Sequence, residues 1–200
     1  GGERKIGSFV RGASVSPAFG ALLFRIARWM EAEMILELGT GLGVSTMYLA
    51  SGPEQAQVAA SEQGAESVPV PVFTYEGNSA RAVFSEKLFK RCGLNGVKVR
   101  CGELDKQLRD LEGEVPGRFL VFVDANHSYE PTIRYVKFML SLAGEEALIV
   151  MDDIYWSKGM YRAWKELISW PDVRVSIDLF HMGILLLRKD LHKTHYKIKF

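Results

Sequence analysis

The 200-residue sequence has only two cysteines, no long hydrophobic run and almost no net charge. Cys92 and Cys101 lie outside any C-x-x-C spacing, so we expect reduced, structural thiols in a cytosolic protein and no disulfide framework. No apolar run approaches the roughly 18 residues of a membrane span, and no signal peptide opens the chain. We therefore expect a cytoplasmic location and no membrane partner.

The net charge is +1, and no local basic patch stands out in the sequence. Proteins that bind nucleic acids need such a patch to contact the phosphates, so we expect no nucleic-acid partner. The 48% hydrophobic content suffices for one sizeable core, which favours a single α/β domain. The chain begins with Gly1-Gly2 and not with Met, so we expect that an N-terminal part of the natural protein is missing.

The chain is organised around a stretch in which an apolar run ends in an acid, Glu37, and three glycines follow at alternate positions, Gly39, Gly41 and Gly43. A segment compatible with a helix begins near Ser45, so the pattern predicts a strand, a glycine turn and a helix. Glycines let the main chain approach a ligand closely, and the first helical turn offers free N–H groups. This combination is typical of nucleotide binding.

Hydrophobic periodicity predicts five strand-helix units and a closing hairpin. Strands are expected at residues 34–38, 70–76, 97–101, 119–123, 147–151, 173–179 and 183–187, and helices at residues 16–30, 45–50, 78–92, 105–112, 129–144 and 157–170. The last two strands must be antiparallel, because a parallel return needs a longer crossover. Residues 51–69 are predicted as a long surface loop. The predicted organisation is a lead-in segment at 1–15, one domain at 16–188 and a tail at 189–200, either solvated or extending the sheet edge.

Acidic residues follow four of the predicted parallel strands: Glu37, Glu76, Asp124 and the pair Asp152-Asp153. In a parallel α/β sheet, ligands bind beyond the carboxyl ends of the strands, so these acids are candidate site residues. Glu76 stands where an acid can accept hydrogen bonds from both hydroxyls of a ribose, because a carboxylate has two acceptor oxygens. The alternative for Glu76 is a solvated glutamate at a strand end.

The spacing E-x-G-x-G-x-G resembles the first motif of the class I S-adenosylmethionine-dependent methyltransferases. A dinucleotide-binding fingerprint would instead need its third glycine at Val44. With the five strand-helix units and the hairpin, the resemblance covers residues 16–188. It implies a Rossmann-like methyltransferase fold of the α/β class, with a mostly parallel seven-stranded sheet, a C-terminal antiparallel hairpin and helices on both faces.

The resemblance implies that the cofactor is S-adenosylmethionine. The motif residues would hold its methionine and ribose portion, Glu76 would bind the ribose hydroxyls, and the backbone at 102–104 would contact adenine. The residues implied in cofactor binding are Glu37, Gly39, Gly41, Gly43, Ser45, Glu76, Gly102, Glu103, Leu104 and Asp124.

Asp124, Asp152 and Asp153 resemble the metal site of the catechol and caffeoyl-CoA O-methyltransferase group. Oxygen ligands suit a hard divalent cation such as Mg²⁺, Mn²⁺ or Ca²⁺, which could lower the pKa of an acceptor hydroxyl. The chain departs from that group in having Asp153 in place of an asparagine and His127 in place of the catalytic lysine. An imidazole, with an ordinary pKa of about 6.5, is a competent base. His127 and Asp124 are therefore the candidate catalytic residues. The alternatives are that Asp152 or Asp124 only caps loop N–H groups, and that His127 with Tyr129 only opens the next helix.

These observations predict transfer of a methyl group from S-adenosylmethionine to a hydroxyl of a small molecule, with a divalent cation as a second cofactor. Candidate walls of the acceptor pocket are Trp156, Tyr155, Tyr129, His181 and Met182. Related enzymes are often dimers, so the resemblance also implies a homodimer. Two alternatives stay open: a Rossmann-type nucleotide-dependent oxidoreductase, which Val44 and the hairpin disfavour, and a protein that keeps the methyltransferase fold for binding without turnover.

Overall fold

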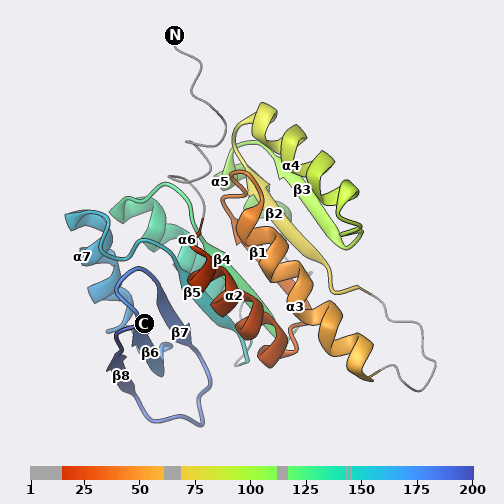
Figure 1. Ribbon diagram of the computed structural model, residues 1–200. Helices are drawn as coiled ribbons and strands as arrows, with labels where there is room; N and C mark the ends of the chain where they lie inside the picture. The colour runs from red at the N-terminus through yellow and green to blue at the C-terminus, as the bar shows by residue number, and fades with distance from the viewer. Residues whose placement is uncertain (1–14, 61–68, 112–116, 143, 145) are drawn as a thin grey trace.

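The computed structural model describes residues 15–60, 69–111 and 117–200 except 143 and 145, so nearly all of the predicted lead-in segment lies outside it. A twisted sheet of eight strands runs through the molecule in the order β3-β2-β1-β4-β5-β7-β6-β8 (Figure 1). The strands are β1 (Met34–Leu38), β2 (Val72–Glu76), β3 (Val97–Cys101), β4 (Phe119–Val123), β5 (Leu148–Met151), β6 (Val175–Asp178), β7 (Gly183–Leu186) and β8 (Thr194–Lys197). Strands β1 to β5 pair in parallel, and β7 is antiparallel to both β5 and β6.

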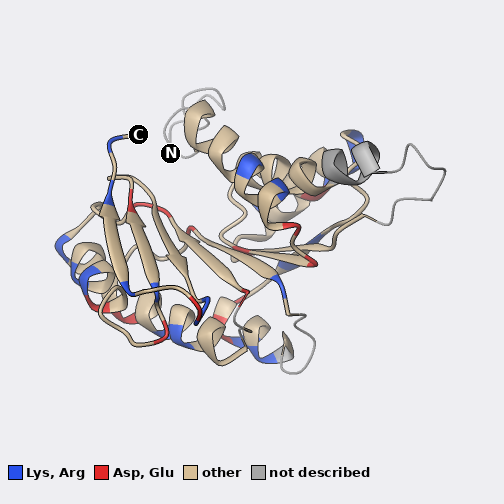
Figure 2. Ribbon diagram, turned by 90° about the horizontal axis from the view of Figure 1, so that it is seen from below, with Lys and Arg blue, Asp and Glu red and all other residues tan. Residues whose placement is uncertain are grey.

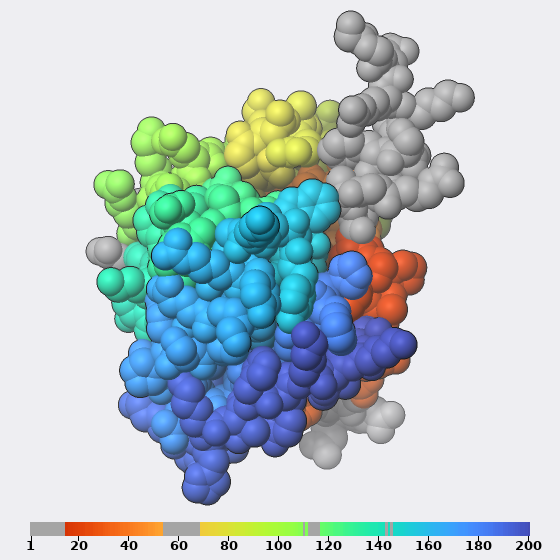
Figure 3. All heavy atoms as spheres, turned by 90° about the vertical axis from the view of Figure 1, so that its left-hand side faces the viewer, coloured from red at the N-terminus to blue at the C-terminus, as the bar shows by residue number. Residues whose placement is uncertain are grey.

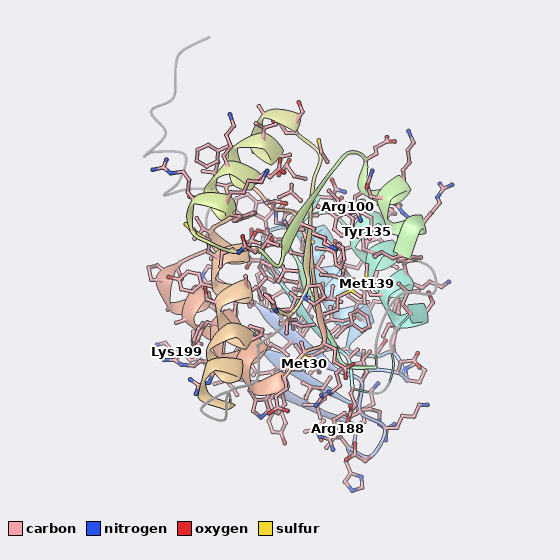
Figure 4. The ribbon with its side chains drawn as sticks, turned by 90° about the vertical axis from the view of Figure 1, so that its right-hand side faces the viewer. Met30, Arg100, Tyr135, Met139, Arg188 and Lys199 are labelled. Atoms are coloured by element: carbon pink, nitrogen blue, oxygen red, sulfur yellow. The ribbon has the colours of Figure 1, made fainter. Side chains whose placement is uncertain are left out.

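Helices cover both faces of this sheet (Figure 2). The helices are α2 (Pro17–Met30), α3 (Val44–Ala60), α4 (Ser79–Arg91), α5 (Leu104–Gln107) with a 3₁₀ turn at Leu108–Leu111, α6 (Tyr129–Leu142) and α7 (Lys158–Leu167). One core lies between the sheet and α2, α3 and α4, and the other lies between the sheet and α6, α7 and the 3₁₀ turn. Tyr135 and Met139, for example, point from α6 into the second core (Figure 4).

Helix starts follow the capping signals in the sequence. The side chains of Ser16, Asn78 and Ser157 each accept a hydrogen bond from the backbone N–H three residues later, at 3.4, 3.0 and 3.1 Å. Pro17 occupies the first helical position, where its missing N–H costs nothing. The caps fix where α2, α4 and α7 begin, and two of these helices follow strand-end loops that carry candidate site residues.

The predicted loop at 51–69 is wrong over its first half, because α3 continues through Pro53 to Ala60. A proline inside a helix removes one backbone hydrogen bond and crowds the preceding turn, which is why the sequence indicates an end there. The segment after Pro53 is rich in helix-forming alanine, glutamine and glutamate, and the helix is held by packing against α2. Gly52 makes that packing close: a Cβ atom there would lie 2.6 Å from the Phe24 carbonyl oxygen.

The predicted count of seven strands is also wrong, because residues 194–197 form an eighth strand that pairs in parallel with β6. The predicted tail at 189–200 therefore extends the sheet edge. Its sequence, Thr-His-Tyr-Lys, has no apolar alternation, and three of the four side chains are exposed, so periodicity gives no signal. The predicted helix at 105–112 is shorter than expected, a single α-turn followed by the 3₁₀ turn. Among the described residues, no helix has the length and apolar character to cross a membrane.

Candidate active site

The glycine turn joins β1 to α3 and lies against the ends of two neighbouring strands. Gly39, Gly41 and Gly43 have φ values of +107°, +54° and +81°, a region that favours glycine. The backbone N–H of Gly39 donates to the Tyr75 carbonyl at 3.0 Å, which fixes the turn to β2. On the other side, a Cβ atom at Gly39 would lie only 2.0 Å from the Asp124 carbonyl oxygen. Glycine is thus required there by both conformation and space.

Glu37 supports this turn from behind and is completely buried. Its carboxylate accepts hydrogen bonds from the hydroxyls of Ser45 at 2.5 Å, Thr74 at 2.6 Å and Thr46. Burial raises the pKa of Glu37 to about 7, with a smaller contribution from the charge of Glu76, although the three hydroxyls oppose the rise. The predicted residues Glu37, Gly43 and Ser45 build the turn and do not line the cavity in front of it.

Replacing Glu37 by glutamine should change how stability depends on pH. A folded-state pKa raised from 4.5 to about 7 means that Glu37 favours the folded state below pH 4.5 and loses this contribution as the pH rises through 7. Between pH 4.5 and 7, the free energy of unfolding of the wild type should therefore fall by about 3 kcal/mol relative to that of Glu37→Gln. Denaturant unfolding of the cofactor-free protein at pH 5 to 8 measures the difference. Glu86→Gln, at an exposed helix position, is the control, and parallel curves for Glu37→Gln and the wild type would contradict the expectation.

A cavity of about 970 Å³ opens at the carboxyl ends of the parallel strands. Ten predicted site residues line it: Gly39, Gly41, Glu76, Gly102, Glu103, Leu104, Asp124, His127, Asp152 and Asp153. The candidates Trp156 and His181 line it too, whereas Tyr129, Tyr155 and Met182 do not. The cavity has two halves. β1, β2 and β3 end at one side of it, whereas β4 and β5 end, and the antiparallel β7 begins, at the other side. The glycine turn and Glu76 belong to the first half, and the aspartates belong to the second.

Glu76 organises the first half. Its Oε2 accepts the N–H of Gly41 at 3.0 Å, and its Oε1 accepts the N–H of Asn78 at 2.7 Å. The guanidinium of Arg81 donates to the same Oε1 at 2.7 and 3.1 Å. The carboxylate is almost fully buried, but its Oε2 has capacity for one more donor. Sequence reasoning missed Arg81, and its position in the first turn of the helix after an acidic strand end is the signal that could have revealed it.

Asp124 and Asp152 stand directly after β4 and β5. Their N–H groups donate to the carbonyls of Leu38 at 2.8 Å and Val123 at 2.9 Å, which continues the hydrogen bonding of the sheet to its edge. Burial raises the pKa of each carboxyl to about 7, and neighbouring carboxylates add to the rise: Glu37 and Asp153 for Asp124, and Asp124 and Asp153 for Asp152. At this end of the cavity, protonation or a cationic partner is therefore favoured over several charged carboxylates side by side.

His127 lies between the two acidic loops. Its Nε2 is 3.4 Å from Asp124 Oδ1, and its Nδ1 is 3.8 Å from Asp153 Oδ2. Its ring also lies 6.2 Å from the exposed ring of Trp156. Asn126, His127 and Asp153 all have positive φ, which is uncommon for residues other than glycine and typical of functional loops. The loops after β4 and β5 thus hold the imidazole at the cavity wall.

The donor chemistry of the three aspartates fits a hard divalent cation, because such ions prefer carboxylate oxygens. As the side chains stand, however, no group of three His, Cys, Asp or Glu residues within the described part of the chain could hold a metal ion. Closing these carboxylates on an ion therefore requires different rotamers. Aromatic groups complete the wall of this half: Phe19 from α2 lies edge-on to His181, with ring centroids 5.7 Å apart. The sequence does not indicate Phe19, whose spacing marks it only as part of an apolar stripe.

Comparison with known proteins relates this geometry to one family. The family model described as "Methyltransferase domain" matches residues 36–154. Two catechol O-methyltransferases, from Niastella koreensis and Mycobacterium tuberculosis, are each 32% identical to the chain, over 70% and 74% of it. The matches span only 58% and 60% of these relatives' own lengths.

Solved structures show the same fold. An O-methyltransferase from Bacillus cereus, in complex with SAH, superimposes with a TM-score of 0.70 at 23% identity, over 90% of this chain and 86% of that one. The O-methyltransferase TomG from Streptomyces achromogenes, in complex with SAM, gives 0.71 at 24% identity, over 88% and 82%. The predicted Rossmann-like methyltransferase fold is thereby confirmed. Because the family model matches more than half of the chain and spans the turn, Glu76 and the three aspartates, the chain belongs to the methyltransferase domain family.

Proposed function

We propose that this protein transfers a methyl group from S-adenosylmethionine to a hydroxyl group of a small molecule. The observation that carries the proposal is the two-part cavity. The glycine turn and the acid Glu76 line one half of it, and the imidazole of His127 lies among aspartates in the other half. The family assignment supports the reaction type. The two curated relatives named above are catechol O-methyltransferases, which favours a catechol-like acceptor.

In this proposal the cofactor occupies the first half of the cavity. The main chain at Gly39 and Gly41 offers the close approach that the methionine portion needs. Glu76 Oε2, which has capacity for one more donor, would accept a hydrogen bond from one ribose hydroxyl, and residues 102–104, which line the cavity, would contact adenine. Glu37 and Ser45 act indirectly, because they hold the turn in its shape.

The acceptor occupies the second half. Asp124, Asp152 and Asp153 would hold a divalent cation, which lowers the pKa of an acceptor hydroxyl when bound. His127, at the wall of the cavity, would take the proton, since a neutral imidazole has one nitrogen free to accept it. Trp156 and Phe19 limit the access of water and orient a flat acceptor in line with the methyl group.

Calorimetric titration with S-adenosylhomocysteine tests the proposal, first in EDTA and then with Mg²⁺ and catechol. We expect micromolar cofactor binding in both buffers and catechol binding only with Mg²⁺, together with methylated product when S-adenosylmethionine is supplied. Cofactor binding without product over a panel of hydroxylated acceptors would instead favour a protein that keeps the fold for binding. A folded sample that binds no cofactor would overturn the proposal.

A further inference from the structure

Strand β8 brings a lysine to two of the loops that build the acceptor half of the cavity, the loop after β5 and the link between β6 and β7. The C-terminal residues run along one edge of the molecule next to α2 (Figure 3), and the ring of Phe200 lies 5.2 Å from that of Phe19. In the register of the sheet, Lys197 is opposite Asp178 at the end of β6. The eighth strand therefore ends close to the hairpin link that carries His181.

Lys197 contacts two aromatic side chains and an acid there. Its Nζ donates a hydrogen bond to the Tyr155 hydroxyl at 2.8 Å and lies 3.6 Å from Asp178 Oδ2. The same ammonium group lies over the rings of Tyr155 and Phe180, at 5.0 and 4.6 Å from their centroids. Cation–π and charge-assisted contacts of this kind each favour the charged ammonium group in this place.

Asp178 is the buried centre of this arrangement, with its side chain only 3% exposed. Its Oδ2 accepts the Tyr155 hydroxyl at 2.6 Å, and its Oδ1 accepts the backbone N–H of Phe180 at 2.9 Å. A buried carboxylate without partners is costly, so Tyr155 and Lys197 together keep this acid paired. We call Lys197, Asp178 and Tyr155 the Lys197 network.

The network joins two of the walls of the acceptor half. Tyr155 belongs to the loop after β5, between Asp153 and Trp156, and Phe180 precedes His181 in the hairpin link. The loops are also tied directly, because the N–H of Ile154 donates to the His181 carbonyl at 3.1 Å. Each loop contains a non-glycine residue with positive φ, Asp153 at 54° and Phe180 at 68°. Such conformations persist only where surrounding contacts hold them.

We propose that Lys197 is a positioning residue for the acceptor: through Tyr155 and Asp178 it fixes the two loops that hold Asp153, Trp156 and His181 at the cavity. The inference rests on the proposed function. Lys197 itself does not line the cavity, and neither do Tyr155 and Asp178, so the effect passes through the loops. The cofactor half, built from the ends of β1 to β3, lies outside the network.

The test compares Lys197→Met with Lys193→Met. Lys193 ties the other end of the same segment, by hydrogen bonds to the carbonyls of Ser169 at 3.0 Å and Trp170 at 2.6 Å, so its loss reports general loosening of β8. For Lys197→Met we expect the KM of the acceptor to rise about tenfold, because small displacements of positioning groups weaken the binding of a substrate. The Kd of S-adenosylhomocysteine should stay within about twofold of the wild-type value. Lys193→Met should change neither, and Lys197→Arg should restore most of the acceptor affinity because it keeps the charge.

Amide hydrogen exchange supplies a readout that needs no turnover. The backbone amides of residues 152–157 and 179–182 should exchange faster in Lys197→Met than in the wild type. In Lys193→Met their exchange rates should equal those of the wild type. An unaltered KM together with unaltered exchange would overturn the inference, as would equal effects of the two lysine variants. Failure of the proposed function looks different: the wild type would bind S-adenosylhomocysteine yet methylate no acceptor, while the exchange comparison would still report on the network.

Discussion

Gly39→Ala is expected to lower the affinity for S-adenosylhomocysteine by at least about 100-fold, which corresponds to about 2.7 kcal/mol. The added methyl group would lie 2.0 Å from the Asp124 carbonyl oxygen, a backbone atom of the neighbouring strand end. A flexible side chain could move away, but the backbone of Asp124 is held by the sheet, because its N–H donates a hydrogen bond to the Leu38 carbonyl oxygen. The turn must therefore shift or change φ from +107°, and in either case the main chain leaves the place that we propose for the cofactor.

Calorimetry measures this loss, with the melting temperature recorded in parallel. Gly93→Ala is the matched control: Gly93 also has positive φ, at +73°, but a Cβ atom there meets nothing within 4 Å, and the residue follows α4 away from the cavity. Gly93→Ala should cost stability through backbone strain and leave the cofactor affinity unchanged. A folded Gly39→Ala protein with wild-type affinity would show that the turn does not approach the cofactor.

The position of the site was predictable because strand ends in a parallel sheet meet at one edge. Each candidate acid was identified from its place after an apolar run, and the structure brings Glu76, Asp124, Asp152 and Asp153 to one cavity. The helix caps at Asn78 and Ser157 are equally predictable from the sequence, because capping depends on residues only three positions apart. Short-range sequence signals thus suffice to predict the strand-end acids and the helix caps, and the parallel sheet then brings the acids together.

What the sequence did not reveal depends on contacts between distant segments. Glu37 was expected at the cofactor, but hydroxyls from α3 and β2 enclose it behind the turn, and Thr74 is 37 residues away. Strand β8 has no burial pattern of its own, since it exists through pairing with β6. Arg81 and Phe19 enter the cavity through the placement of their helices. Each of these features needs the three-dimensional arrangement before it can be recognised.

Asp152→Asn should reduce methyl transfer to a catechol by at least about 100-fold in Mg²⁺ and leave the affinity for S-adenosylhomocysteine within about twofold. Asp152 follows β5, and burial, with a further contribution from the charges of Asp124 and Asp153, raises its pKa to about 7, so a divalent cation would gain most from binding here. The amide keeps the shape of the side chain but removes one of the negative charges. Initial rates as a function of Mg²⁺ concentration, with product detected by chromatography, measure the effect. Asp172→Asn, at an exposed position after α7, is the control.

The variant Asp153→Asn distinguishes the loss of an oxygen ligand to the cation from the loss of one negative charge. This substitution removes the same charge from the same cluster, yet it installs the residue that the resembling O-methyltransferases carry at this place, and its amide oxygen can still bind a cation. It also removes the carboxylate 3.8 Å from His127 Nδ1. We expect Asp153→Asn to retain activity within about tenfold of the wild type, because one oxygen ligand is kept. Equal losses in the two variants would mean that the cluster acts through its total charge, and full activity of Asp152→Asn in EDTA would exclude the cation from the reaction.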